Sequence, residues 1–124
     1  MRPVNRPIGT PYKKRGSLWS LGYHTGVDFP APTGTAVRAN VSGKVVFEGW
    51  GGAYGNMVVI QRFLKRHYYC HLKRATVRTG MRVKKNEIIG RVGSTGNSTG
   101  PHLHYEVRKY PWKFGQDVDP TRFF

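Results

Sequence analysis

The chain has 124 residues, which is enough for one domain, and its 21 Lys and Arg against 6 Asp and Glu give a net charge of +15. The single cysteine, Cys70, excludes an internal disulfide, and no apolar stretch is long enough to span a membrane, so we expect no membrane insertion. The charge exceeds what solubility requires and predicts an anionic partner: nucleic acid, an anionic cell wall polymer or a membrane surface.

Residues 1–20 are predicted to form an irregular basic lead-in to a single domain that covers residues 21–124. Proline and glycine interrupt regular structure at five positions, Pro3, Pro7, Gly9, Pro11 and Gly16. The segment is basic but lacks the apolar run of a secretory signal. If the protein acts outside the cytoplasm, we therefore expect another route to deliver it.

The remaining sequence predicts strands throughout. Short runs rich in β-branched and aromatic residues alternate with Gly, Pro, Asn and Ser turns: TAVRANV, KVVFEGW, NMVVIQRF, YYCHL, ATVRTG, EIIGRVG and LHYEVRK. We predict an all-β protein, a compact antiparallel β sandwich or barrel-like hybrid with long surface loops and little or no helix. Similar strand pairs occur in biotinyl and lipoyl carrier domains, so this architecture does not identify a function.

The first segment with chemical potential is GYHTGVDFPAPTGTAV, in which His24 and Asp28 stand four residues apart. Gly26 within that spacing and Pro30 just after it favour a shaped loop that enters a strand over a helix. An imidazole and a carboxylate suit Zn²⁺, which in catalytic sites takes three protein ligands and a water. A third ligand must come from elsewhere in the chain.

The second segment, GNSTGPHLHYEV, places His102 and His104 two residues apart after a glycine-rich loop. In a strand, side chains two apart leave the same face, so both imidazoles point into one space. One of the two would complete the ligand set with His24 and Asp28, and the other would lie beside the metal, where a general base belongs.

Three residues near the middle of the chain have simpler interpretations. His71 in YYCHL lies on a strand between bulky neighbours, where a histidine alone is usually structural. His67 in the basic turn RFLKRH is predicted to be a surface residue, and Cys70 a small buried hydrophobic residue.

In order and context, the segments HTGVDFPAPTGTAV, YGNMVVI, YYCHL and VKKNEIIGRVGSTGNSTGPHLHYEV closely resemble the lysostaphin and LytM-type zinc metallopeptidases, which hydrolyse peptide bonds in bacterial peptidoglycan. The resemblance covers residues 21–121. It implies one Zn²⁺ held by His24, Asp28 and His104, with His71 and His102 in the catalytic positions. The turn RFLKRH departs from the family, whose members usually have a Gly or Asn-Gly hairpin there.

The glycine-rich loop 93–100 and several aromatic residues are predicted to border the substrate. The resemblance implies that this loop lines the substrate groove, and the predicted groove residues are Tyr23, Tyr54, Tyr69, Asn97, Ser98 and Thr99. Turn stabilisation for the loop and core packing for the tyrosines are the simpler alternatives.

The resemblance favours a zinc-dependent endopeptidase that cuts stem or cross-bridge peptides of peptidoglycan, such as a phage-type or other cell wall lytic enzyme. The charge of +15 would hold it on teichoic acids or other wall anions. The alternative is a non-catalytic peptidoglycan-binding or activator module, since some relatives of this kind have lost ligands. A nucleic-acid-binding domain would explain the charge but not the histidines, so we do not expect a nucleic acid partner. The scissile bond is not identified, and we favour the D-alanyl to diamino acid link over glycine bridges.

Overall fold

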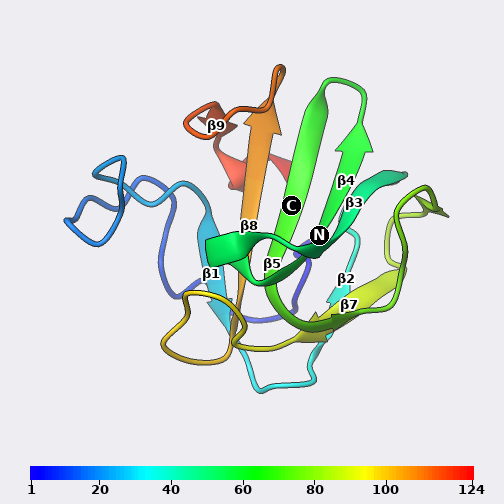
Figure 1. The fold of residues 1–124 in the computed structure, drawn as a ribbon, viewed down its shortest axis with the longest axis horizontal. Coiled ribbons are helices and arrows are strands. Elements are labelled where there is room, and N and C mark those ends of the chain that lie inside the picture. Colours follow the sequence, from blue (N-terminus) through cyan, green and yellow to red (C-terminus); the bar gives the residue numbers. More distant parts are fainter.

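The fold is a single antiparallel sheet of nine strands, described over residues 1–124 in a computed structural model (Figure 1). The strands are β1 (Val27–Pro30), β2 (Ala36–Arg38), β3 (Gly43–Trp50), β4 (Asn56–Arg62), β5 (Lys65–Ala75), β6 (Arg82–Val83), β7 (Ile88–Val92), β8 (His102–Lys109) and β9 (Asp117–Val118). Two 3-10 turns, η1 (Gly52–Tyr54) and η2 (Pro120–Phe123), are the only helical elements. The prediction of an antiparallel all-β fold is confirmed, with a connected and open sheet in place of two separate sheets. No helix has the length and apolar character needed to cross a membrane.

The strands follow the order β1-β8-β5-β4-β3-β6, with β9 added beside β8 and the β2–β7 pair attached to β5. The first part of β5 pairs with β4 and β8, whereas its last part, from Leu72 to Ala75, pairs with β7. The register shifts within β5 at this point, so the strand bends and carries the β2–β7 pair across the end of the long strands (Figure 1). The sheet therefore bends at β5 without closing into a barrel.

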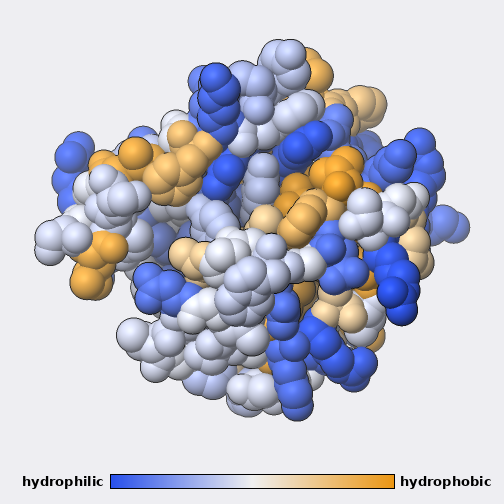
Figure 2. All heavy atoms as spheres, viewed as in Figure 1, coloured by the Kyte–Doolittle hydropathy of each residue, from blue (hydrophilic) through white to orange (hydrophobic).

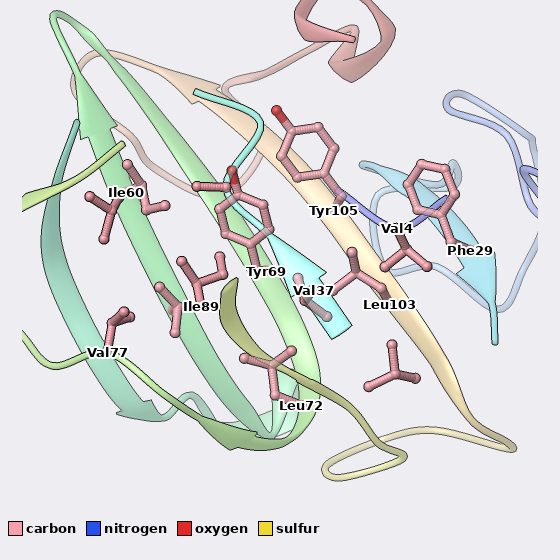
Figure 3. Packing of buried hydrophobic residues seen from close by; sticks show 14 of the residues in the cluster. Val4, Phe29, Val37, Ile60, Tyr69, Leu72, Val77, Ile89, Leu103 and Tyr105 are labelled. Carbon is pink, nitrogen blue, oxygen red and sulfur yellow. The ribbon is translucent and has the colours of Figure 1, made fainter. Parts of the chain in front are cut away.

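The main core fills the space between the long strands and the β2–β7 pair. Figure 3 shows Tyr69 and Leu72 from β5, Leu103 and Tyr105 from β8, and Val37 from β2 turned toward one another. All five side chains are fully buried. A smaller cluster of Val59, Tyr68 and Cys70 lies on the opposite face, which confirms Cys70 as a small buried residue. The alternation along β5 and β8 therefore separates a core face from a second face, and that second face carries the site.

Residues 1–20 contain no strand or helix, and they pack onto the rest of the chain. Val4 belongs to the main core, and Thr10 forms an isolated bridge with Asp28. The backbone of Lys13 and Lys14 exchanges two hydrogen bonds of 2.9 Å with His24. A segment expected to lead into the domain thus supports the loop that carries a candidate ligand.

The prediction that His67 lies on the surface is wrong, because its side chain is 1% exposed. The turn consists of Phe63 and Leu64 alone, and β5 already begins at Lys65. His67 therefore shares the core face with Tyr69, two residues later, and its ring packs edge-on against Phe123. Burial lowers the pKa of His67 to about 4.

Candidate metal centre

Three residues from two strands and a loop meet at the β1–β8 edge. The antiparallel register places Asp28 directly opposite His104, and His24 comes from the loop before β1. His104 Nδ1 lies 2.9 Å from Asp28 Oδ1, and His24 Nε2 lies 3.2 Å from both of these atoms. The structure therefore brings together the three predicted ligands, although His104 lies 76 residues after Asp28 in the chain.

The triangle of donor atoms fits a tetrahedral zinc ion. With metal–ligand bonds of about 2.0 to 2.1 Å, a tetrahedral ion separates its ligand atoms by roughly 3.3 Å. The observed edges of 2.9 to 3.2 Å are close to this value. Two imidazole nitrogens and one carboxylate oxygen are also the donors that zinc prefers. His24 and His104 are buried and Asp28 is partly exposed, so the triangle opens to solvent on one side.

Hydrogen bonds fix which nitrogen of each ligand histidine faces the triangle. His24 Nδ1 donates to the carbonyl of Pro11 at 3.1 Å, and His104 Nε2 donates to Glu106 Oε1 at 2.9 Å. The remaining nitrogens, His24 Nε2 and His104 Nδ1, point into the triangle, where each would present a lone pair to a bound ion. This arrangement, in which the second ring nitrogen binds a carboxylate or carbonyl, is typical of metal-binding histidines.

The carboxylates make this position strongly negative. Burial alone would raise the pKa of Asp28, but hydrogen bonds and charge from His104 and His24 hold it well below its usual range. Burial alone would lower the pKa of His104, but Asp28 and Glu106 raise it to about 9. The two negative charges that favour a proton on this ring also favour a divalent cation beside it.

Glu106, which the sequence analysis missed, is the centre of a buried hydrogen-bond network beneath His104. Its side chain is fully buried, and besides His104 it accepts from Thr25 at 2.7 Å, Tyr54 at 3.1 Å and Arg108 at 2.6 Å. Burial would raise the pKa of Glu106, but the bonds from His104 and the charge of Arg108 lower it to about 2. The signal was present in HLHYEVR, since positions 102, 104, 106 and 108 share one face of a strand.

His71 reaches the site through a β-bulge. By alternation it would share the core face of Tyr69, but β5 holds one extra residue opposite Asn56–Val58, and His71 takes a left-handed φ of 63°. The bulge turns the imidazole toward the site, 4.8 Å between ring centroids from His102. Because a non-glycine residue rarely adopts this conformation, the backbone at His71 is held by its surroundings.

His71 and His102 each present Nε2 to the site. His71 Nδ1 donates to the carbonyl of Thr95 at 2.7 Å, and His102 Nδ1 donates to that of Gly100 at 2.8 Å. His102 Nε2 lies 3.9 Å from Asp28 Oδ1, beside the triangle but outside it. Burial lowers the pKa of His71 to about 4, so this ring is neutral at neutral pH. Both imidazoles therefore flank the ion position and turn Nε2 toward it.

Two loops interlock to form one wall of the site. A side chain at Gly96 would meet the backbone of Gly55 at 2.4 Å and that of Ala53 at 2.6 Å, so only glycine permits this contact. Asn97 N donates to the carbonyl of Ala53 at 2.8 Å. The contact fixes the loop 93–101, whose carbonyls orient His71 and His102.

The predicted groove residues lie in different places. The prediction for Tyr69 is wrong, because it is fully buried in the core and bonded to Asn40. Tyr54 stacks against His104 at a centroid distance of 5.7 Å, and Tyr23 donates to Asp117 at 2.8 Å. Asn97 and Thr99 are exposed on the loop, and Ser98 Oγ lies 3.3 Å from His102 Nδ1. Apart from Tyr69, substrate contact by these residues stays a prediction.

Comparison with known proteins gives consistent results. Residues 22–120 match peptidase family M23. The chain is 43% identical over 124 residues to the DD-carboxypeptidase/endopeptidase Mpg of Neisseria meningitidis, a match that covers 95% of the chain and 26% of the relative. It is 44% identical over 105 residues to lysostaphin of Staphylococcus simulans, covering 82% of the chain and 21% of the relative. The chain therefore spans about a quarter of the length of these curated relatives.

Solved structures show the same architecture. The catalytic domain of lysostaphin superimposes with a TM-score of 0.90 at 37% sequence identity, covering 96% of this chain and 92% of that one. A zinc-containing peptidase from Vibrio cholerae superimposes with a TM-score of 0.83 at 32% identity, covering 95% of this chain and 37% of that one.

Proposed function

Because the chain belongs to peptidase family M23, we propose that it is a zinc-dependent endopeptidase that hydrolyses peptide bonds of bacterial peptidoglycan. The observation that carries the proposal is the donor triangle of His24, Asp28 and His104 with two oriented histidines beside it. The names of the relatives, which include a DD-endopeptidase and a glycyl-glycine endopeptidase, support this substrate class.

The residues of the chain divide the chemistry between them. A zinc ion bound at the triangle would polarise the scissile carbonyl and lower the pKa of a water molecule. His102 Nε2, 3.9 Å from Asp28 Oδ1, would accept the proton of the attacking water. His102 would then pass that proton to the leaving amine, and His71 Nε2, whose ring lies 4.8 Å between centroids from that of His102, would serve as a second proton carrier. The carbonyls of Thr95 and Gly100 hold both rings in the required tautomer.

Metal exchange and two substitutions test this function. A chelator should abolish cleavage of purified walls and Zn²⁺ should restore it. His24→Ala should lose both zinc and cleavage, whereas His102→Ala should retain zinc and lose cleavage. Of these two residues, His24 belongs to the donor triangle and His102 does not. Undiminished lysis by metal-free protein, or full cleavage by His102→Ala, would contradict the proposal.

A non-catalytic wall-binding module is the alternative, and the complete set of five residues argues against it. Digestion of sacculi followed by mass spectrometry separates the two, because binding alone creates no new peptide ends. We further propose the D-alanyl to diamino acid link as the bond cut, since the match to the DD-carboxypeptidase/endopeptidase covers 95% of the chain and includes the segment that supports His24. Release of glycine-terminated fragments alone, from walls of two chemotypes, would contradict this choice.

We also propose that the basic surface holds the protein on anionic wall polymers such as teichoic acids. Of the 21 Lys and Arg, Arg108 alone lies within 4.0 Å of a carboxylate, so nearly all of the positive charge is free. Binding to walls should weaken with salt and with removal of teichoic acid. Delivery by a phage route stays a prediction.

A further inference from the structure

The β4–β5 turn exposes apolar side chains at one end of the sheet. Phe63 is 81% exposed and Leu64 63% exposed, and Tyr110 after β8 is 61% exposed. Together with Trp112, these residues form what we call the tip patch. The turn lies at the top of Figure 1, and hydrophobic atoms show at the same edge in Figure 2. Large apolar groups exposed side by side usually mark an interaction surface.

The tip patch is a fixed surface built from two segments. Lys65 of β5 pairs directly with Lys109 of β8, which brings the turn beside residues 110–112. The indole nitrogen of Trp112 donates to the carbonyl of Leu64 at 3.1 Å, and the rings of Tyr110 and Trp112 meet edge to face at 5.0 Å. The two segments and the rings of Tyr110 and Trp112 are therefore held together before any partner binds.

Fold stability does not explain the residues of this turn. Phe63 has a left-handed φ of 53°, a conformation that favours glycine or asparagine. With 81% of its surface exposed, its ring gains little from packing. A large apolar residue at a position that disfavours it, and that buries little of it, points to a role outside the fold.

Positive charge surrounds the tip patch. Five cations flank it in the two segments, and none has a carboxylate within 4.0 Å: Arg62, Lys65, Arg66, Lys109 and Lys113. Lys65 and Lys109 stand directly opposite each other, an arrangement of like charges that disfavours the isolated sheet. The acids nearest along the chain are engaged elsewhere, Glu106 with Arg108 and Asp117 with Tyr12 and Tyr23. These five cations around the tip patch therefore favour an anionic partner.

We propose that the tip patch docks the protein on an anionic lipid surface. Phe63 and Leu64 form the turn itself, and four of the five cations lie on the strands that lead to the tip patch, Lys113 being in the loop after β8. This geometry places apolar groups among acyl chains and ammonium and guanidinium groups among phosphates, as in interfacial membrane-binding segments. A polysaccharide or a nucleic acid would instead require polar partners for its hydroxyls or bases, whereas the turn offers the exposed apolar side chains of Phe63 and Leu64.

Docking at the tip would leave the metal centre free. His104 and Lys109 are five residues apart on β8, about 17 Å at the rise of an extended strand. A protein held by its tip would present the site some distance from the bilayer. The inference does not depend on the proposed peptidase activity, because it rests on the opposite end of the strands.

Vesicle binding tests the inference on the full chain. Co-sedimentation should show binding to vesicles of phosphatidylcholine with phosphatidylglycerol, weak binding to phosphatidylcholine alone, and weakening by salt. The double substitution Phe63→Ser with Leu64→Ser should reduce vesicle binding by about tenfold or more, because it removes the apolar area that the bilayer would bury. The matched control is Leu18→Ser, since Leu18 is 90% exposed on a different loop. Unchanged zinc content and unfolding temperature would verify that each variant folds.

Two outcomes would overturn the inference. One is equal vesicle binding by the double variant and the unsubstituted protein. The other is binding to isolated wall polymers alone, with no affinity for anionic vesicles, which would assign the whole charge to the wall. Either result would leave the zinc and cleavage tests unaffected, so a failure of this inference is distinguishable from a failure of the proposed function.

Discussion

Replacing Glu106 by Gln is the sharpest test of how the fold prepares the metal site. The carboxylate accepts from His104 through Oε1 and from Arg108 through Oε2, at 2.9 and 2.6 Å. An amide of the same shape has one oxygen and one NH₂ group. It can therefore satisfy one of these donors and must oppose its NH₂ to the other, and it carries no charge to balance Arg108.

Two effects of this substitution follow from the geometry. Outer partners of metal-binding histidines typically contribute about 10- to 100-fold in metal affinity, so the zinc dissociation constant of Glu106→Gln should rise by about tenfold or more. Arg108 would keep its charge in a site where its side chain is 10% exposed. Removing one partner of a buried ion pair costs about 3 to 5 kcal/mol, so we expect a loss of about 3 kcal/mol in the free energy of unfolding.

The assay is competition for zinc with a chromophoric chelator, together with urea unfolding of the zinc-loaded protein. Glu48→Gln is the matched control, because it makes the same chemical change at a carboxylate that forms no ion pair within 4.0 Å. If Glu106→Gln and Glu48→Gln had the same zinc affinity and stability, Glu106 would not orient His104, and our account of the network would be wrong.

Three further predictions concern histidines and a tyrosine. At the left-handed position of His71, His71→Val should be less stable than His71→Asn by about 1 kcal/mol or more in urea unfolding, because a β-branched residue tolerates this φ poorly; equal stability would refute the strain. Tyr69→Phe should cost about 1 to 2 kcal/mol in the free energy of unfolding by leaving Asn40 Oδ1 without a donor, with cleavage unchanged, whereas a raised KM would place Tyr69 in the groove after all. The pKa of His67, about 4 in the fold, lies below its ordinary 6.5, so only the unfolded chain gains a proton between these values. The contribution of His67 to the free energy of unfolding should fall by about 3 kcal/mol as the pH drops from 6.5 to 4, and His67→Phe should flatten the measured slope accordingly; an unchanged slope would contradict the assignment.

The sequence alone predicted the strand composition and the pairing of histidines on one face. The alternation in HLHYEVR places His102 and His104 on the same face of β8, as expected. The same rule applied two residues further would have found Glu106, whose role follows from strand parity as directly as that of the histidines. The surface prediction for His67 failed because the turn proved to be only two residues long, so β5 already begins at Lys65 and strand alternation places His67 on the same buried face as Tyr69.

Local periodicity therefore determined which residue types could serve the site and which faces of their strands they occupy. Only the tertiary structure decided the rest. The register of β1 against β8 sets Asp28 opposite His104, the bulge in β5 turns His71 away from the face that its position in the sequence assigns, and the packed basic segment orients His24. The physical reason is that strand pairing and bulges depend on contacts between residues far apart in the chain, which no local pattern encodes.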